Sequence, residues 1–454
     1  MFQKLFNEKG EKEIFFGKKS LSLFSGFIFF VFLMSSSGTA FGIPSFARQT
    51  GLSCAACHTV FPELTAFGRQ FKMNGYTLTN IKTIKQTEKD TEGNKRTLVN
   101  ILGTVPLSAM MQDGITFVSK PDSGTQNGTI EFPQQFSIFY GGQITPHMGA
   151  FVQLTNEDGP DGGAFGLDLA DIRYARQGKG STPLTYGVTL NNAPTVQDLW
   201  NTTPAWGYPY SASGVAADPE VSTFIEAGPD IGAVGLSAYA MIDNWVYVEA
   251  AAYRSAHLGV ELPLGPQSEG ALSGVSPYWR VALQHSFGKS YFEVGSFGIA
   301  AKVYPSGVTG LTNNYTDLGF DAQYEYQINS GQLTIHSSYI AEKQKLNSTF
   351  DAGESDNLSN NLDVFKIDAS LFLKPGINFT LGYFDDAGSK DAGLWGEDFA
   401  GNIPNNNGVR AQFSYLPWQN TKLSAQYVAF NKFNGTTDGA SDNNSIYLQL
   451  WFLF

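Results

Sequence analysis

The sequence of 454 residues is short of charge. Asp, Glu, Lys and Arg make up 15% of it, against roughly a quarter in soluble globular proteins. The 29 basic residues are outnumbered by 41 acidic ones, for a formal net charge of -12 at pH 7. No positive surface is available for phosphates, which excludes a generally basic nucleic-acid binder. With 14% aromatic residues and 49 glycines, the composition also argues against an ordinary cytosolic enzyme.

Long apolar runs are missing from about Leu98 to the end, so no membrane helix is expected there. The first forty residues have a different character. Five lysines between Lys4 and Lys19 precede an apolar run, Leu21–Met34, and small residues at Gly38 and Ala40 follow it. This order predicts a secretory signal, residues 1–40, cleaved after Ala40. The alternative is an N-terminal membrane anchor, but the run is shorter than the roughly 20 residues that a spanning helix needs.

Cysteine is almost absent, and both copies lie in one motif, Cys54, Cys57 and then His58. The spacing C-x-x-C-H is the attachment signal of a c-type haem, because two thiols three residues apart add to the two vinyl groups of one porphyrin and the adjacent imidazole lies under the iron. A single disulfide, a zinc site and a thioredoxin-like redox pair are the alternatives. Zinc requires further ligands, and no second Cys or His pair lies nearby. The βαβ setting of a redox pair is also missing.

A short helix is expected after the motif, starting near Pro62 and Glu63 and ending before Gly75. Its apolar face would form a wall for the porphyrin. Arg69 and Lys72 lie off that face and are interpreted either as partners of the haem propionates or as solvated charges. A segment of this size, residues 41–90, is too short to bury a large core alone, so another part of the chain must shelter it.

The remainder, residues 91–454, shows strict alternation typical of β-strands. The clearest case is the C-terminal segment, in which Ile446, Leu448 and Leu450 share one face while Ser445 and Gln449 share the other. The same scheme recurs over residues 317–326 and 365–373, and the chain ends on Phe454, as outer-membrane barrels typically do. We predict an all-β fold, a transmembrane barrel of about sixteen antiparallel strands with apolar side chains outside and polar ones inside. A soluble β-sandwich or propeller also gives alternation; the export signal and the terminal phenylalanine favour the barrel.

Connections between the predicted strands differ in length. Tight turns are expected at 143–149, 242–244, 288–290 and 374–378, and long loops at 158–163, 347–361 and 385–407. Short periplasmic turns and long external loops are typical of such barrels. Residues 190–210 do not alternate and contain three prolines and two tryptophans. This stretch is interpreted as an ordered loop that either folds over the haem or narrows the pore.

Residues 44–76 resemble the fused monohaem cytochrome-porins of iron-oxidising bacteria. The resemblance rests on Pro44 to His58, on Phe61-Pro62-Glu63-Leu64 and on Phe67 to Tyr76, with a weaker likeness around 190–210. It implies one covalent haem c at Cys54 and Cys57 with His58 as iron ligand. It also implies a location in the bacterial outer membrane and electron transfer from extracellular Fe(II) to a periplasmic c-type cytochrome or other carrier, an Fe(II):cytochrome c oxidoreductase activity. The alternatives are a haem-plugged porin for small solutes and an electron conduit from a non-iron donor.

The motif does not fix the second axial ligand of the iron. Methionine is the usual partner where a high potential is required, and Fe(II) is a weak reductant. Met110 shares a face with Ser108 on the first strand and is expected to point into the lumen, so it ranks above Met73, which is closer in sequence. The remaining possibilities are His147, His257, His285 and His336. Acidic loop residues are interpreted either as attracting Fe(II) or as solvated, namely Asp158, Asp161, Asp351, Glu354 and Asp356.

Overall fold

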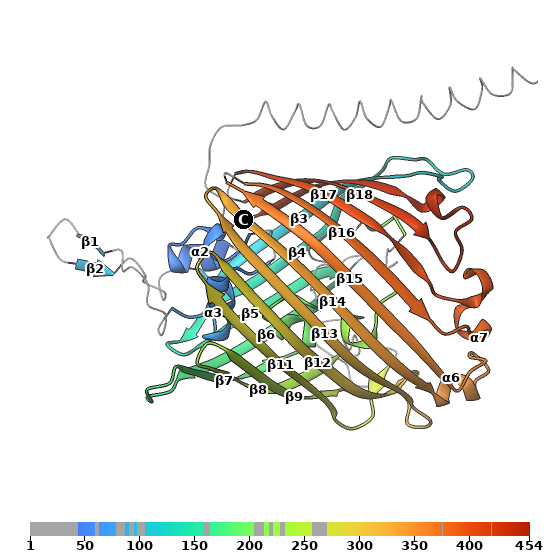
Figure 1. Cartoon of the computed structure of the whole chain (residues 1–454), viewed down its shortest axis with the longest axis horizontal. Helices are drawn as coiled ribbons and strands as arrows, with labels where there is room; N and C mark the ends of the chain where they lie inside the picture. Colours follow the sequence, from blue (N-terminus) through green and yellow to red (C-terminus); the bar gives the residue numbers. More distant parts are fainter. Residues whose placement is uncertain are drawn as a thin grey trace, which may run out of the picture.

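The computed structural model describes residues 44–59, 63–78, 87–89, 95–97, 105–157, 164–203, 213–217, 221–227, 232–256, 270–374, 376–418 and 420–454. The predicted export signal, residues 1–40, lies outside this set. Most of the described chain forms one antiparallel sheet that closes on itself (Figure 1). Among the described residues, no helix is long and apolar enough to span a membrane.

Strands follow one another around the barrel in chain order. The first, β3 (Leu107–Val118), pairs with the last, β19 (Ser445–Leu453), and β9 (Val246–Ser255) pairs with β11 (Ser276–Phe287), so the ring has no free edge. The sheet contains 17 strands, but the two-residue β10 (Ala271–Leu272) continues the line of β11, because both strands pair with β12 (Ser290–Tyr304). Sixteen strand positions therefore build the wall, which confirms the predicted fold class and strand number.

The remaining strands of this sheet are β4 (Thr129–Thr145), β5 (Met148–Glu157), β6 (Ala164–Gln177), β7 (Leu184–Asn191), β8 (Ala233–Ile242), β13 (Asn313–Ile328), β14 (Gly331–Leu346), β15 (Ser359–Leu373), β16 (Ile377–Gly388), β17 (Asn406–Trp418) and β18 (Thr421–Lys432). A separate two-stranded sheet is formed by β1 (Thr87–Lys89) and β2 (Lys95–Thr97).

The two ends of the barrel differ in their connections. At one end, short turns join β4 to β5, β8 to β9, β11 to β12 and β15 to β16, as predicted. At the other end the connections are longer and include α6 (Asn347–Asp351) and α7 (Ala392–Trp395), on the right of Figure 1. The first barrel strand begins, and the last ends, at the short-turn end. The helices before the barrel, α2 (Pro44–Thr50) and α3 (Ala66–Met73), lie at this end too.

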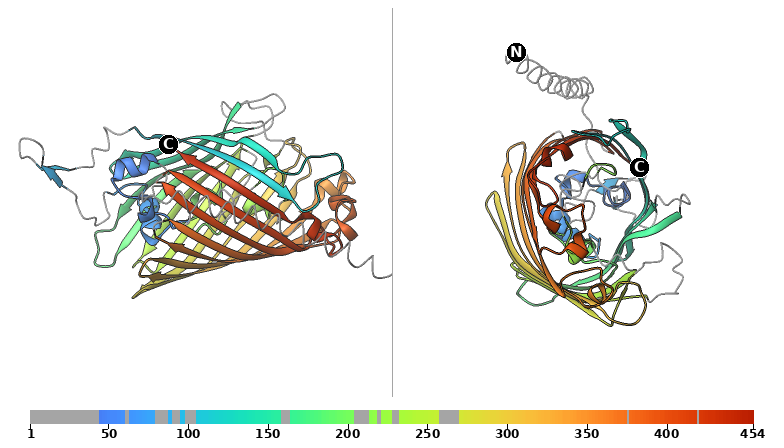
Figure 2. Two further views of the ribbon diagram at one scale, coloured as in Figure 1. Left: turned by 90° about the horizontal axis from the view of Figure 1, so that it is seen from above. Right: turned by 90° about the vertical axis from the view of Figure 1, so that its right-hand side faces the viewer.

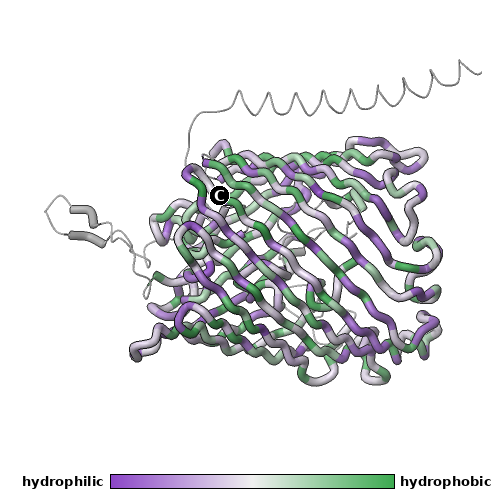
Figure 3. The backbone as a smooth tube through the Cα atoms, in the orientation of Figure 1, coloured by the Kyte–Doolittle hydropathy of each residue, from purple (hydrophilic) through white to green (hydrophobic). Residues whose placement is uncertain are grey.

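The wall is apolar outside and polar inside, the inverse of a soluble fold. On β13, Leu318 and Phe320 are 42% and 52% exposed, whereas Asp317 and Asp321 on the opposite face are 3% and 6% exposed. The tube in Figure 3 shows the resulting alternation of hydrophobic and hydrophilic residues along the strands. A polar interior and an apolar exterior are the arrangement of barrels that span lipid.

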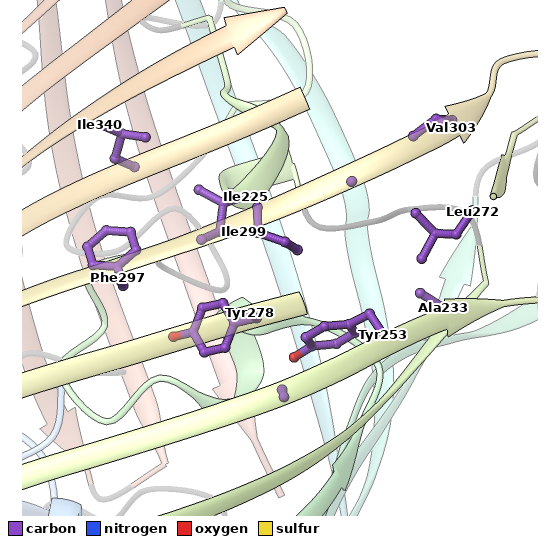
Figure 4. Packing of buried hydrophobic residues seen from close by; sticks show 11 residues of the cluster. Ile225, Ala233, Tyr253, Leu272, Tyr278, Phe297, Ile299, Val303 and Ile340 are labelled. Atoms are coloured by element: carbon purple, nitrogen blue, oxygen red, sulfur yellow. The ribbon is translucent and has the colours of Figure 1, made fainter. Parts of the chain in front are cut away.

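One sector of the lumen departs from the predicted polar interior. Tyr278, Phe297 and Ile299 on β11 and β12 face inward and form an apolar cluster with Ile225. Ile225 belongs to α5 (Phe224–Ala227), in the long connection between β7 and β8, and it lies among these side chains in Figure 4. The strands are apolar here because an inserted segment covers them and removes them from water.

Candidate haem site in the barrel lumen

Helix α2 is docked on the inner face of β4. The Gln49 side chain donates from Nε2 to the Gly141 carbonyl oxygen at 2.7 Å, and its Oε1 accepts from the Gln143 amide at 3.2 Å. The helix approaches this closely because Gly141 and Gly142 have no side chains. A Cβ at Gly141 would lie 2.8 Å from the Ser45 hydroxyl oxygen. The N-terminal segment therefore lies within the ring of strands, as the end-on view in Figure 2 shows.

The predicted haem-attachment motif forms a compact turn between the two helices. Cys54 begins the 3-10 turn η1 (Cys54–Ala56), and the His58 amide donates to the Cys54 carbonyl at 2.7 Å. The Nδ1 atom of His58 lies 3.1 Å from the Glu63 carbonyl oxygen. A carbonyl only accepts, so Nδ1 carries the proton, and the lone pair that a metal ligand requires is on Nε2. This tautomer is the one that an iron-binding His58 needs.

The two thiols do not have the pKa values of a reactive redox pair. They are free and not joined in a disulfide. Burial raises the pKa of Cys57 to about 12 and, with a contribution from Cys57, raises the pKa of Cys54 well above its ordinary value. Reactive C-x-x-C pairs instead have lowered thiol pKa values. The described residues hold no group of three or more His, Cys, Asp or Glu suited to a metal ion.

The N-terminus of α3 holds the attachment turn. Thr65 is the N-cap: its hydroxyl accepts from the Gly68 amide at 3.1 Å and donates to the Ala56 carbonyl at 2.7 Å, while its amide donates to the Cys57 carbonyl at 2.8 Å. The helix thus begins at Ala66 and not near Pro62 and Glu63, because the hydroxyl of Thr65 provides the cap. Pro62 itself lies outside the described residues.

The C-terminus of α3 ends as predicted at Gly75. Its φ is 72°, its amide donates to Lys72, and the amide of Tyr76 reaches back to Phe71. This pair of hydrogen bonds is a Schellman motif, which favours glycine at the left-handed position. A Cβ at Gly75 would also lie 2.9 Å from the carbonyl oxygen of Arg173 on β6. The end of the helix is therefore fitted against the barrel wall.

Arg69 is buried and paired, so it is not a solvated charge, and its role as a propionate partner stays a prediction. The guanidinium lies 2.6 Å from Glu325 on β13, donates to the Leu64 carbonyl at 2.7 Å and lies 4.4 Å from the ring centre of Tyr291. Burial alone would lower the pKa of Arg69, but Glu325 and Tyr291 raise it above its ordinary value. The salt bridge joins α3 to the wall and fixes this helix in the lumen.

Lys72 is also withdrawn from water. Its ammonium donates to the Asp198 carbonyl at 2.7 Å. Burial and the nearby Arg173 lower the pKa of Lys72 to about 8. Neither Arg69 nor Lys72 is a solvated charge, and the sequence gives no indication of either partner because both lie more than a hundred residues away.

The connection between β7 and β8 meets α3 inside the barrel. Its described residues 192–203 include α4 (Pro194–Gln197), which contacts β6 and β7, and Leu199 and Trp200, which pack with Met73. Asp198 accepts backbone N–H groups from Trp200 and Thr202. Burial opposes the charge on Asp198, but Arg280 and the backbone N–H groups of Trp200 and Thr203 lower its pKa. We call residues 192–203 the inward loop; it lies in the lumen and packs against α3, and whether it covers a haem stays a prediction.

The two candidate methionine ligands lie in different places. Met110 is fully buried on the lumen side of β3, as predicted, in an apolar cluster with Phe71 of α3 and Trp451 of β19. Met73 is 5% exposed and packs on the other side, with Trp200 and Tyr239. Both adjoin the haem segment, and both remain predictions as iron ligands.

The other histidines differ in where they face. His336 is buried in the lumen beside Thr202, 3.4 Å away, and Asp368. His285 stacks on Trp245 at 3.9 Å between ring centres, with Phe287 nearby, near the short-turn end. His147 lies in the β4–β5 turn, with Nε2 2.8 Å from Arg176. His257 lies outside the described residues.

No protein-family model matches the sequence, and no curated protein matches it. Among solved structures, the outer-membrane expressed OmpT of Vibrio cholerae has a TM-score of 0.44 at 12% identity, over 77% of this chain and 98% of that one. OmpF of Salmonella typhi has a TM-score of 0.45 at 12% identity, over 81% and 100%. The anion-selective porin from Comamonas acidovorans has a TM-score of 0.44 at 12% identity, over 77% and 98%.

Proposed function

We propose that this chain is a bacterial outer-membrane protein, a porin-like barrel that houses a c-type cytochrome segment at its periplasmic mouth. The outer face carries large apolar side chains such as Phe320 and Leu381, 52% and 61% exposed. Such a face is stable only against lipid, and a closed barrel leaves no strand edge unpaired there. Short turns are periplasmic in barrels of this type, which assigns α2 and α3 to the periplasmic mouth.

The observation that carries an electron-transfer role is the position of the attachment turn. It lies within the barrel, capped by Thr65, and the His58 Nδ1 atom lies 3.1 Å from the Glu63 carbonyl oxygen. A haem c bound at Cys54 and Cys57 supplies a one-electron carrier there. The hydrocarbon layer is about 30 Å thick, too far for one fast electron transfer. A carrier sheltered in the lumen divides that distance.

We further propose extracellular Fe(II) as the electron donor and a periplasmic c-type cytochrome or other carrier as the acceptor. This rests on the resemblance of residues 44–76 to the cytochrome-porins. Oxidised iron precipitates at neutral pH, so removing its electron outside the cell leaves the solid outside. Each Fe(II) loses one electron and becomes Fe(III), and one acceptor is reduced. Asp351, Glu354 and Asp356 are exposed at the long-loop end and carry the oxygen ligands that suit hard cations.

Mixing the purified holoprotein with anaerobic Fe(II) tests this proposal. We expect the visible spectrum to change to that of reduced haem, and we expect His58→Ala to lose the low-spin spectrum. A Cys54→Ala, Cys57→Ala variant is the control and should be colourless. An oxidised spectrum that persists with Fe(II), in a protein that dithionite still reduces, would rule out iron and favour another donor.

The second candidate is a haem-plugged porin for small solutes. The barrel supports this role directly, because its closed wall and polar interior are described, whereas the cofactor is inferred from a motif. The plug of α2, α3 and the inward loop argues against free passage. Solute efflux from proteoliposomes decides between them: flux through the intact holoprotein would favour the porin.

A further inference from the structure

One buried cation in the lumen has no anionic partner within the described chain. Lys422 lies near the short-turn end of β18, is 7% exposed and pairs in register with Trp451 of β19. Its Nζ atom is 4.5 Å from the centre of the Trp451 ring. Among the described residues, no carboxylate and no hydrogen-bond acceptor meets this ammonium.

Three buried arginines of the lumen are each paired with a carboxylate, and Lys72 donates to a backbone carbonyl. Arg69 has Glu325 at 2.6 Å, Arg173 has Asp171 at 2.6 Å and Arg280 has Glu293 at 3.3 Å. A buried charge without an anion is costly, and a cation–π contact offsets only part of that cost. Lys422, which has neither kind of partner among the described residues, is therefore a candidate site for an anion that is not part of the polypeptide.

The position of Lys422 identifies that anion. Trp451 belongs to the apolar cluster that contains Phe71 of α3 and Met110, so Lys422 borders the wall that receives the haem segment. A c-type haem is tethered to its cysteines by the vinyl side of the ring, and its two propionate carboxylates project from the opposite side. They would therefore require a cationic partner away from Cys54 and Cys57 themselves. Arg69, the first cation after the motif, is already paired with Glu325.

We propose that the Lys422 ammonium, beside Trp451, is the binding site for a haem propionate carboxylate. The inference rests on the proposed covalent haem but not on Fe(II) as the donor. A cation fixed near the ring favours the reduced iron, since reduction removes one positive charge. Lys422 is accordingly a positioning residue that also raises the midpoint potential.

Potentiometric titration of the purified holoprotein tests the charge. Lys422→Gln should lower the equilibrium constant for haem reduction by three- to tenfold, at most 59 mV for one electron. Lys422→Arg should restore it. Lys432→Gln, at the far end of the same strand, is the matched control and should leave the potential unchanged. A Lys422→Gln potential equal to that of the wild type overturns the assignment.

A second measurement does not depend on potential. Lys422→Met is compared in the holoprotein and in the haem-free Cys54→Ala, Cys57→Ala background, by the temperature at which the folded barrel is lost on a gel. We expect Met to destabilise the holoprotein, where a propionate loses its partner, and to be neutral or stabilising without haem, where an unpaired charge is removed. The same effect in both backgrounds overturns the proposal. A colourless wild-type protein would overturn the proposed covalent haem as well as the role of Lys422. If the haem is present but Fe(II) does not reduce it, only the proposed donor fails, and the potential and the melting temperature still test Lys422.

Discussion

Gly68→Ala tests whether α3 holds the haem-attachment turn in place. A Cβ at this position would lie 2.3 Å from the Cys57 carbonyl oxygen, and real Cβ contacts below 3.0 Å essentially do not occur. The turn must therefore withdraw by about 0.7 Å, the difference between these two distances. The withdrawal weakens the 2.8 Å hydrogen bond from the Thr65 amide to the Cys57 carbonyl. Overpacking of this kind costs about 1–3 kcal/mol, which reduces the docking equilibrium by about 5- to 150-fold.

The assay is the low-spin haem spectrum of the purified protein during heating. Cys54, Cys57 and His58 are unchanged in Gly68→Ala, so covalent haem should be retained while the spectrum is lost several degrees below the wild type. Gly180→Ala, in the turn between β6 and β7, is the control, because its Cβ meets no described atom within 4 Å. Identical melting of all three proteins would refute the reasoning that α3 positions the turn.

Two further predictions concern other parts of the barrel. Glu325→Gln leaves the Arg69 guanidinium buried without its carboxylate, at a cost of about 3–5 kcal/mol, and should speed dye efflux from proteoliposomes. Lys120→Gln is the control, because Lys120 belongs to the exposed pair with Asp442, and it should not change efflux. Equal efflux through Glu325→Gln and the wild type would contradict a lumen plugged by α3. Asp391 bridges two long loops: burial alone would raise its pKa, but donors from Asn360 and Ser355 hold that pKa well below the ordinary 3.8. The stabilisation that Asp391 provides is thus present above about pH 4 and lost as the pH falls. At pH 7, Asp391→Ala should therefore speed protease cleavage of these loops without changing the haem spectrum. Unchanged cleavage would count against a bridge between the loops.

The sequence determined the barrel because its signal is local. Neighbouring residues in a strand point to opposite faces, so the alternation of Leu318 and Phe320 with Asp317 and Asp321 revealed both the strand and its two environments. The turns could also be predicted from the sequence, because tight connections and long polar loops differ in length and composition. The C-x-x-C-H motif could also be recognised locally, because its thiols and imidazole are neighbours in the chain, and the haem that it predicts stays a prediction.

What fills the lumen was decided by tertiary structure. Partners such as Arg69 and Glu325, or Lys72 and Asp198, lie more than a hundred residues apart, and no spacing in the sequence relates them. The apolar sector around Tyr278 and Phe297 was unexpected for the same reason: only the folded chain places α5 over it.

Lys422 shows the same division. Its alternation with the outward residues of β18 follows from the sequence, whereas its burial beside Trp451 without a carboxylate follows only from closure of the barrel. Local periodicity encodes which way a side chain faces, and three-dimensional closure decides what it meets there.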